Sequence, residues 1–428
     1  MALTIERVLA WEALDSRGLP TVACAVTLEG GGTAQATAPS GASTGGHEAH
    51  ERRDGGARFG GKGVRAAVAA VNGEIASALR GRPADDQPEI DRLLRDLDGT
   101  RNLSRLGGNA VLAASVACAR AVADARRQPL WRLLAPDGAP LLPLPMVNVL
   151  SGGAHAGWLI DIQDVLVVPI GAVSFSEAIE WAARVRAAAA DVLRSHGHRV
   201  DLVADEGGLA APLTSNRAAI EVVAAGIERS GLVPGEQAAI AIDVAATHVQ
   251  DRTGYLLAGE DRSLSATELA AELRSWCDAF PIVSIEDAMG EDDLDGWRIA
   301  GDLLPEVQLL GDDLFATSAE RLSDGIDAGI ANAVLVKPNQ VGTLADAQRV
   351  VELAQSSGYA TVLSARSGDT EEAWLADLAV GWRTGQVKVG STTRAERTAK
   401  WNRLLRIEAE HPDAIFAGRS SLQRAVSA

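Results

Sequence analysis

Lysine is almost absent from this sequence of 428 residues. Only Lys62, Lys337, Lys388 and Lys400 occur, so the other 36 of the 40 basic side chains are arginine. An arginine stays protonated at physiological pH, whereas a lysine can lose its proton near neutral pH when its surroundings favour this. Lys337 and Lys388 each follow a strand-like apolar segment, where they are either solvated strand ends or groups with a chemical task. The bias toward arginine favours the chemical task.

Aromatic and sulfur-containing side chains are also scarce. Aromatic residues make up 4% of the chain, while hydrophobic residues make up 47%, so the core must consist mainly of Ala, Val, Leu and Ile. The three cysteines, Cys24, Cys118 and Cys277, are odd in number and far apart. Their spacing excludes a disulfide framework and a cysteine zinc site, and it favours a reducing compartment.

Positive charge is in short supply overall, since the formal net charge is −17 and the isoelectric point about 4.9. Such a chain is a poor partner for nucleic acid or for an anionic membrane surface. The first residues do not form a basic segment followed by an apolar one, and no uncharged apolar stretch could span a bilayer. We therefore expect a cytoplasmic protein, in which a few cations or a bound metal attract any anionic substrate.

The first third of the chain predicts a small α+β domain over residues 1–135. Residues 5–13 and 21–28 alternate as strands do, on either side of a turn. Residues 63–80 and 108–126 have the periodicity of helices.

After a proline-rich stretch, the rest of the chain alternates between short apolar strands and amphipathic helices. This pattern over residues 140–428 predicts an α/β fold with a parallel barrel rather than an open sheet. The predicted strands are 146–150, 164–169, 239–244, 282–285, 308–310, 333–336 and 361–363, and the predicted helices include 174–195, 266–279, 318–328 and 344–356.

Three predicted barrel strands in succession each lead to a carboxylate, namely Asp243, Glu286 and Asp312. Catalytic groups of β/α barrels lie at the carboxyl ends of the strands. Acidic residues also commonly cap helices, which is the alternative interpretation. Three converging carboxylates would repel one another unless a cation joins them, and oxygen ligands of this kind suit Mg²⁺.

Glu206 precedes two glycines in the segment Asp205-Glu206-Gly207-Gly208. The segment is either an ordinary turn or a loop that holds a general acid over the site.

Motifs along nearly the whole chain resemble the enolase family. They are Asp15-Ser16-Arg17-Gly18, Pro39-Ser40-Gly41-Ala42-Ser43-Thr44-Gly45, Gly152-Gly153-Ala154-His155-Ala156, Asp205-Glu206-Gly207-Gly208, Ser284-Ile285-Glu286-Asp287, Gly311-Asp312-Asp313-Leu314, Lys337-Pro338-Asn339-Gln340, Arg366-Ser367-Gly368 and Asp377-Leu378-Ala379-Val380. The resemblance implies a small N-terminal α+β domain and an enolase-type eight-fold β/α barrel that departs from strict alternation at its start. It also implies a homodimer or a larger assembly.

The resemblance further implies a role for each site residue. Lys337 is the base that removes the proton beside the substrate carboxylate, and Lys388 stabilises the resulting enolate with two Mg²⁺ ions, a strategy for which the enolase superfamily is itself the standard example. The second ion is expected to arrive with the substrate. The other implied roles are Asp243, Glu286 and Asp312 as ligands of the first ion, Ser43 as a lid residue on the second ion and the substrate, Arg366 and Ser367 as phosphate binders, Glu206 as the acid that expels hydroxide, and His155 near the leaving group.

Three positions around the substrate depart from the family pattern. Ala365 replaces a histidine, Trp158 replaces an asparagine, and the family's Gln-Glu pair reads Gln163-Asp164, which leaves the catalytic carboxylate one methylene shorter. Asp164 therefore retracts its carboxylate by about 1.5 Å, one C–C bond, while Ala365 opens room beside the substrate. Misplacement by about 1 Å can reduce a rate on the order of 100-fold.

The retained lysines and carboxylates, together with these replacements, predict unchanged enolate chemistry on a changed substrate. We expect a small anionic substrate related to 2-phosphoglycerate, preferably an analogue with a carboxyl group on phosphorus. Such an analogue is dehydrated to carboxyphosphonoenolpyruvate in phosphonate antibiotic pathways. The alternatives are an ordinary glycolytic enolase and a non-catalytic binding protein with the same fold.

Overall fold

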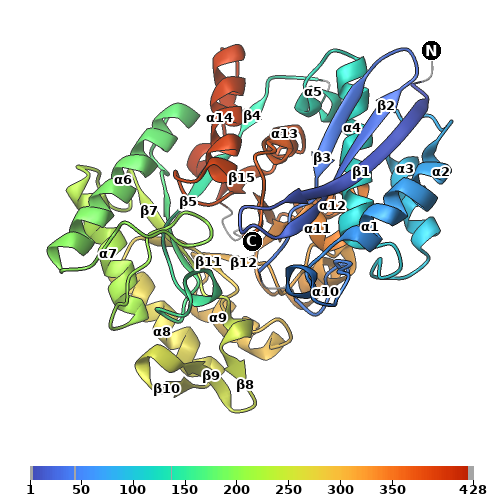
Figure 1. The fold of residues 1–428 in the computed structure, drawn as a ribbon. Coiled ribbons are helices and arrows are strands. Elements are labelled where there is room, and N and C mark those ends of the chain that lie inside the picture. Colours follow the sequence, from blue (N-terminus) through green and yellow to red (C-terminus); the bar gives the residue numbers. More distant parts are fainter. Residues whose placement is uncertain (1–2, 43–44, 136, 423–428) are drawn as a thin grey trace.

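The computed structural model describes residues 3–42, 45–135 and 137–422. Its N-terminal part is a small α+β domain built on a three-stranded antiparallel sheet of β1 (Ile5–Leu14), β2 (Pro20–Leu28) and β3 (Thr33–Thr37) (Figure 1). The two predicted strands are confirmed as β1 and β2. β3 was not predicted, because the strand has only five residues, and most of their side chains are small.

Helices cover one face of this sheet. α1 (Arg65–Ala70) and α2 (Ala76–Leu79) are joined by a turn of π-helix, and α3 (Gln87–Asp98), α4 (Gly108–Ala125) and α5 (Leu130–Leu134) follow. α4 is buried along nearly its whole length and packs against β2 and β3, as well as against helices of the barrel. Its many alanines allow this close approach on several sides, since small side chains let neighbouring elements come near.

Eight strands form a closed barrel, as predicted. In order around the barrel they are β11 (Ile282–Glu286), β12 (Gln308–Gly311), β13 (Ala333–Val336), β14 (Ala360–Ser364), β15 (Gly385–Lys388), β5 (Leu144–Ser151), β6 (Asp164–Val168) and β7 (Ala239–Asp243). Aliphatic side chains such as Leu144, Met146, Leu166 and Leu335 fill its interior.

β6 runs antiparallel to both of its neighbours, so the prediction of an all-parallel barrel from alternation alone is wrong at this strand. The departure that the family resemblance implied is observed instead. β5 and β6 are joined by residues 152–163 without a regular α-helix, and a short connection suits antiparallel pairing, whereas parallel strands need a long crossover. As a result, the start of β6 lies at the end of the barrel where the parallel strands finish, with Asp164 opposite Asp243.

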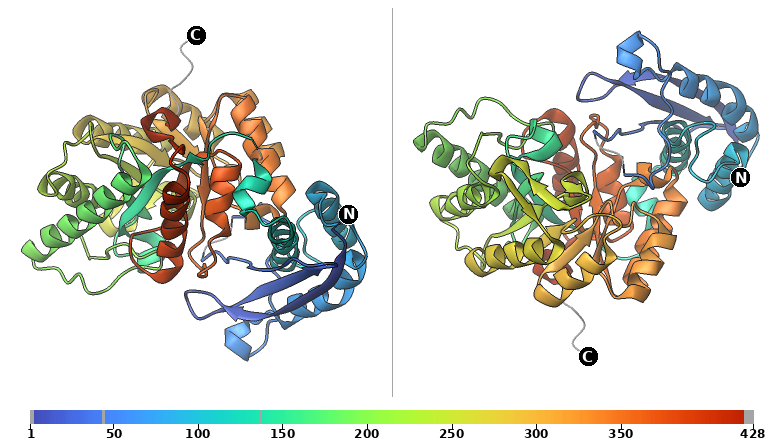
Figure 2. Two further views of the ribbon diagram at one scale, coloured as in Figure 1. Left: turned by 90° about the horizontal axis from the view of Figure 1, so that it is seen from above. Right: turned by 90° about the horizontal axis from the view of Figure 1, so that it is seen from below.

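Helices surround the barrel (Figure 2). The four predicted barrel helices are confirmed as α6 (Phe175–Ser195), α8 (Ala266–Ala279), α10 (Ala319–Ala328) and α12 (Leu344–Ser356), and each begins at a Ser or Thr whose side chain accepts a backbone N–H. Helices that were not predicted are α7 (Asn216–Arg229), α9 (Leu294–Leu303), α11 (Pro338–Val341), α13 (Trp374–Gly381) and α14 (Ala395–Glu410). α13 is buried all round, so it lacks the amphipathic pattern that predicts a helix.

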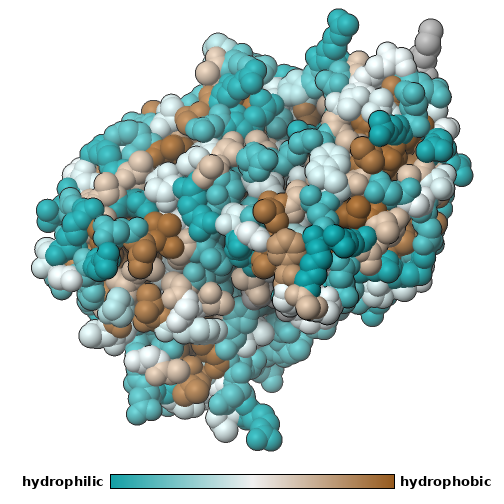
Figure 3. Space-filling view, viewed as in Figure 1, coloured by the Kyte–Doolittle hydropathy of each residue, from teal (hydrophilic) through white to brown (hydrophobic). Residues whose placement is uncertain are grey.

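The remaining strands are short and peripheral. They are β4 (Leu141–Leu142), β8 (Gln250–Asp251), β9 (Gly254–Leu257), β10 (Arg262–Leu264) and β16 (Ile415–Phe416). Across the described part of the chain, every helix is too short or too polar to traverse a bilayer. On the face shown in Figure 3, apolar side chains form small groups among polar ones.

Candidate active site

A cavity lies where the barrel strands end and the N-terminal domain approaches them. Most of the predicted site residues line it, namely His155, Gln163, Glu206, Asp243, Asp312, Lys337, Ala365, Arg366, Ser367 and Lys388. Its free space is small, about 30 Å³, because charged side chains fill its centre. Ser43 lies outside the described residues, whereas Asp164 and Glu286 lie just behind the lining.

The two lysines meet the three strand-end carboxylates inside the barrel mouth. Lys388, at the end of β15, reaches across to β7 and β11, where its Nζ lies 2.8 Å from Asp243 Oδ2 and 2.7 Å from Glu286 Oε2. Lys337, just after β13, forms an ion pair with Asp312, which follows β12. The amines and the carboxylates therefore form one charged cluster, although they come from five different strands.

Burial and charge act in opposite directions on these amines. Burial disfavours the ammonium form of Lys337, but the Asp312 carboxylate outweighs burial and raises the pKa of Lys337 above its ordinary value. For Lys388, burial is likewise outweighed by Asp243 and Glu286, which raise the pKa well above its usual range. Both lysines are ammonium ions in this arrangement.

The carboxylates have a donor set that fits a divalent cation. Burial, and then the neighbouring Asp243, raise the pKa of Glu286 well above its ordinary value. Glu286 Oε1 is buried and has no hydrogen-bond partner among the residues that the structure describes. A buried carboxylate oxygen without a donor is costly in a protein but is a suitable ligand for Mg²⁺. Asp243, Glu286 and Asp312 would hold such an ion.

A tighter acidic group lies beside this set. Ligand atoms of Asp287, Asp312 and Asp313 lie within 4.8 Å of one another. Asp287, however, accepts the backbone N–H groups of Asp312 and Asp313, each at 2.9 Å, with a different oxygen. We conclude that Asp287 orients the segment that carries Asp312. Burial, and then Asp312, raise the pKa of Asp313 to about 7.

Asp164 holds His155. Its Oδ1 accepts hydrogen bonds from Asn148 Nδ2 (2.5 Å) and Ser151 Oγ (2.7 Å), and its Oδ2 lies 3.0 Å from His155 Nδ1. Both oxygens of this shortened carboxylate are thus engaged, and the imidazole, rather than Asp164, lines the cavity. Burial disfavours a charged imidazole, but Asp164, with Glu206 and Asp243 beyond it, raises the pKa of His155 to about 9.

Glu206 faces the same cavity from the loop after α6. The residue is 6% exposed, and Arg397 Nη1 lies 3.9 Å from its Oε1. Burial raises the pKa of Glu206, but Arg397, and then His155, lower it below the ordinary value. In the resting site the proton therefore resides on His155 and not on Glu206.

The opposite wall of the cavity follows β14. Ala365, Arg366 and Ser367 lie there, and Ser367 Oγ accepts the backbone N–H of Ala42 from the N-terminal domain at 2.6 Å. Arg366 is 5% exposed and forms an ion pair with Glu48, also from the N-terminal domain.

Several residues of the site were not predicted from the sequence. Asp313 could have been found, because it directly follows a predicted ligand. Gln340 donates to Asp312 Oδ1 at 3.0 Å, and it could have been found because it ends the motif Lys337-Pro338-Asn339-Gln340. Trp158, which was expected beside the substrate, lies outside the cavity lining; it is half exposed, has a positive φ of 62°, and packs edge-on against His248, which lines the cavity. No local signal marks His248.

Two family comparisons agree with this architecture. Residues 5–134 match the enolase N-terminal domain, and residues 139–425 match the enolase C-terminal TIM barrel domain. The matches include the sheet that precedes the barrel and all eight barrel strands, as well as the lysines and carboxylates at its mouth. The chain belongs to the enolase family.

Proposed function

We propose that this protein is an Mg²⁺-dependent hydro-lyase that removes the proton beside a substrate carboxylate and eliminates water from a relative of 2-phosphoglycerate. The observation that carries the proposal is the pair of buried lysines that meets three strand-end carboxylates across the barrel mouth. Divalent cations held by these carboxylates, with Ser43 as a ligand of a second ion, would supply positive charge that stabilises an enolate.

Lys337 is the proposed base. It has to be neutral to accept the proton, and burial is the contribution to its pKa that favours the neutral amine. The C–H electron pair then becomes the enolate beside the carboxylate, where the Lys388 ammonium offsets its charge. Lys388 fits this role because Asp243 and Glu286 keep it protonated.

The leaving hydroxyl group needs a proton as the C3–O bond breaks. Ligand atoms of His155, Asp164 and Glu206 lie within 4.8 Å of one another, and the pKa of His155, raised to about 9, keeps a proton on its imidazole at neutral pH. We therefore assign proton delivery to the pair His155 and Glu206. Asp164, whose oxygens bind Asn148, Ser151 and His155, is assigned to positioning the imidazole. Gln163 donates to Asp243 Oδ2 at 3.0 Å and orients that ligand.

The proposed substrate is larger than 2-phosphoglycerate, because it carries an additional group. Ala365 lines the cavity where the family pattern has a histidine, so no polar side chain contacts the substrate from this position. Asp164 lies behind His155. Both changes favour an analogue with a carboxyl group on phosphorus, which Arg366 and Ser367 would bind through its anionic oxygens. The product would be carboxyphosphonoenolpyruvate.

A direct comparison of substrates tests the proposal. Purified protein with Mg²⁺ is given 2-phosphoglycerate or the carboxyphosphono analogue, and the formation of the enol product is followed by ³¹P NMR. We expect turnover of the analogue and poor turnover of 2-phosphoglycerate. Rapid turnover of 2-phosphoglycerate would instead identify an ordinary glycolytic enolase, and no turnover of either compound would overturn the proposal.

We further propose a cytoplasmic homodimer or larger homo-oligomer. Leu9, Trp11 and Leu14 on β1 are exposed apolar side chains that such an assembly would cover. Light scattering on the purified protein measures the assembly directly.

A further inference from the structure

A carboxylate of the N-terminal domain contacts Arg366, which lines the cavity at the barrel mouth. Glu48 and Arg366 are 318 positions apart in the sequence, yet Arg366 Nη1 lies 2.7 Å from Glu48 Oε2, and Nη2 lies 3.3 Å from Oε1. Their side chains are 6% and 5% exposed. A two-point contact of this kind fixes the plane of the guanidinium group as well as its position.

Glu48 is itself held by the backbone around it. Its Oε1 accepts the N–H of Gly45 at 3.0 Å. The two residues after Glu48 anchor the segment to both domains. Ala49 N donates to Gln340 O in the barrel, and His50 N donates to Asn102 O in the N-terminal domain, each at 2.7 Å. The carboxylate is therefore presented to Arg366 from an anchored segment.

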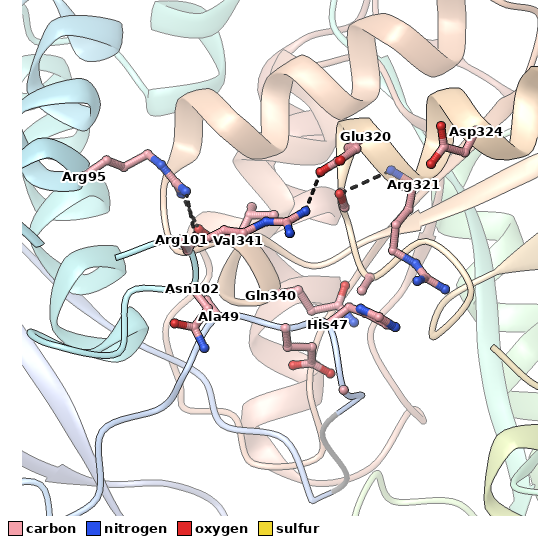
Figure 4. A pocket seen from close by; sticks show the side chains of 14 residues that line it. His47, Ala49, Arg95, Arg101, Asn102, Glu320, Arg321, Asp324, Gln340 and Val341 are labelled. Atoms are coloured by element: carbon pink, nitrogen blue, oxygen red, sulfur yellow. Dashed lines mark hydrogen bonds and ion pairs between the residues drawn. The ribbon is translucent and has the colours of Figure 1, made fainter. Parts of the chain in front are cut away.

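Close packing alone does not hold the Glu48 side chain against Arg366. Residues 46–49 form one wall of a cavity of about 590 Å³, and Arg101 and Glu320 lie across it (Figure 4). Glu48 also borders a second cavity, of about 500 Å³, which Arg17, Arg53 and Lys62 line as well. Arg366 Nη1 also lies 3.3 Å from Asn339 Oδ1, so the two-point contact with Glu48 acts together with this longer hydrogen bond.

We propose that Glu48 is the positioning residue of the anion site, which holds Arg366 in the orientation that binds the phosphate or phosphono group of the substrate. This assignment rests on the proposed function. An arginine that is already immobilised loses less conformational freedom when an anion binds, and immobilising one long side chain costs about 0.5–1.5 kcal/mol. A carboxylate beside an anion site also repels the anion. The direction of the change on removing Glu48 therefore decides between positioning and repulsion.

The experiment measures the binding of inorganic phosphate and of 2-phosphoglycerate to Glu48→Ala and Glu48→Gln by calorimetry in the presence of Mg²⁺. We expect Kd to rise about 3- to 10-fold in Glu48→Ala, as the loss of one immobilised side chain implies, and to rise less in Glu48→Gln. Glu320→Ala is the matched control, since Glu320 lines the same cavity but binds Arg101. Its Kd should stay at the wild-type value.

A second measurement reports on Arg366 without any ligand. Modification of Arg366 by phenylglyoxal, followed by mass spectrometry, should be faster in Glu48→Ala than in the wild type or in Glu320→Ala. A merely structural role for Glu48 would lower the thermal stability without changing this rate or the anion affinity.

The outcomes separate this assignment from the proposed function. Unchanged or tighter phosphate binding in Glu48→Ala overturns the assignment, whatever the turnover. Weaker phosphate binding in a protein that dehydrates no substrate supports the assignment and refutes the proposed function. If the wild-type protein binds no phosphate, the anion site and the role of Glu48 are both overturned.

Discussion

At the scale of single residues, the rarity of lysine is the most informative property of this chain. Two of its four lysines occupy the barrel mouth, whereas arginine serves nearly everywhere else. Lys400 is buried too, but its Nζ binds Asp369 at 3.0 Å and the carbonyl oxygens of Thr370 and Glu396, away from the cavity.

The Lys337→Arg substitution tests whether the amine at this position acts as a base. The positive charge beside Asp312 is kept, but a guanidinium group does not release its proton. We expect proton abstraction to fall at least about 100-fold, the lower range of a general base contribution. Exchange of the substrate α-proton in D₂O, followed by NMR, measures this step. Lys62→Arg, at a position that does not line the cavity, should exchange at the wild-type rate; equal rates for both variants would contradict the role of Lys337.

The pair of His155 and Asp164 predicts a pH dependence of stability. The pKa of His155 rises from an ordinary value of about 6.5 to about 9 in the folded protein. The stabilisation by the charged imidazole is therefore complete below about pH 6.5 and is lost as the pH rises through about 9. The difference in unfolding free energy between the wild type and His155→Gln should be largest near pH 6 and should shrink by pH 10. A difference that does not change with pH would contradict the ion pair.

At the scale of elements, the ends of β11 and β12 are joined by Asp287. This residue has a positive φ of 42° and caps the backbone N–H groups of Asp312 and Asp313. The strained conformation of a non-glycine residue costs on the order of 1–3 kcal/mol, and the two hydrogen bonds offset it. Strand pairing thus places Glu286, while Asp287 places the next carboxylate.

We expect Asp287→Ala to destabilise the protein by about 2 kcal/mol or more, because two buried N–H groups lose their acceptors. Denaturant unfolding measures this loss. Asp295→Ala is the control, since Asp295 is an exposed residue at the start of α9 whose side chain is 93% exposed. It should change stability by less than about 0.5 kcal/mol. Similar effects of the two substitutions would show that the Asp287 hydrogen bonds contribute little.

At the scale of the whole molecule, the N-terminal domain completes the site from outside the barrel. Ser40 and Gly368 exchange backbone hydrogen bonds of 2.7 and 2.9 Å, and Ala42 and Glu48 contact the two residues before Gly368. Arg95 of α3 binds Asp346 of α12 at 2.8 Å. The wall of the cavity that carries Arg366 and Ser367 therefore depends on the docking of the two domains.

Metal binding should stabilise the folded molecule as a whole. A ligand that binds only the folded state at about 100 times its Kd adds about 2.7 kcal/mol. We expect saturating Mg²⁺ to raise Tm by a few degrees relative to protein in EDTA, measured by calorimetry. Glu286→Gln should reduce this shift, because it removes a ligand charge. A Tm that is equal with Mg²⁺ and with EDTA would contradict the assigned metal site.

Local patterns in the sequence were sufficient to predict much of the fold. Short apolar strands, amphipathic helices and carboxylates at strand ends depend on neighbouring residues, so they predicted the barrel and the convergence of Asp243, Asp312 and Lys337. α13 escaped prediction because burial on every side removes its periodicity.

Contacts between distant residues were decided only by the tertiary structure. The antiparallel direction of β6 depends on its pairing with β5 and β7, and this pairing sets Asp164 against His155. The meeting of Glu48 with Arg366 requires two domains to dock. Such contacts depend on how the whole chain closes on itself, and no short stretch of sequence contains both partners.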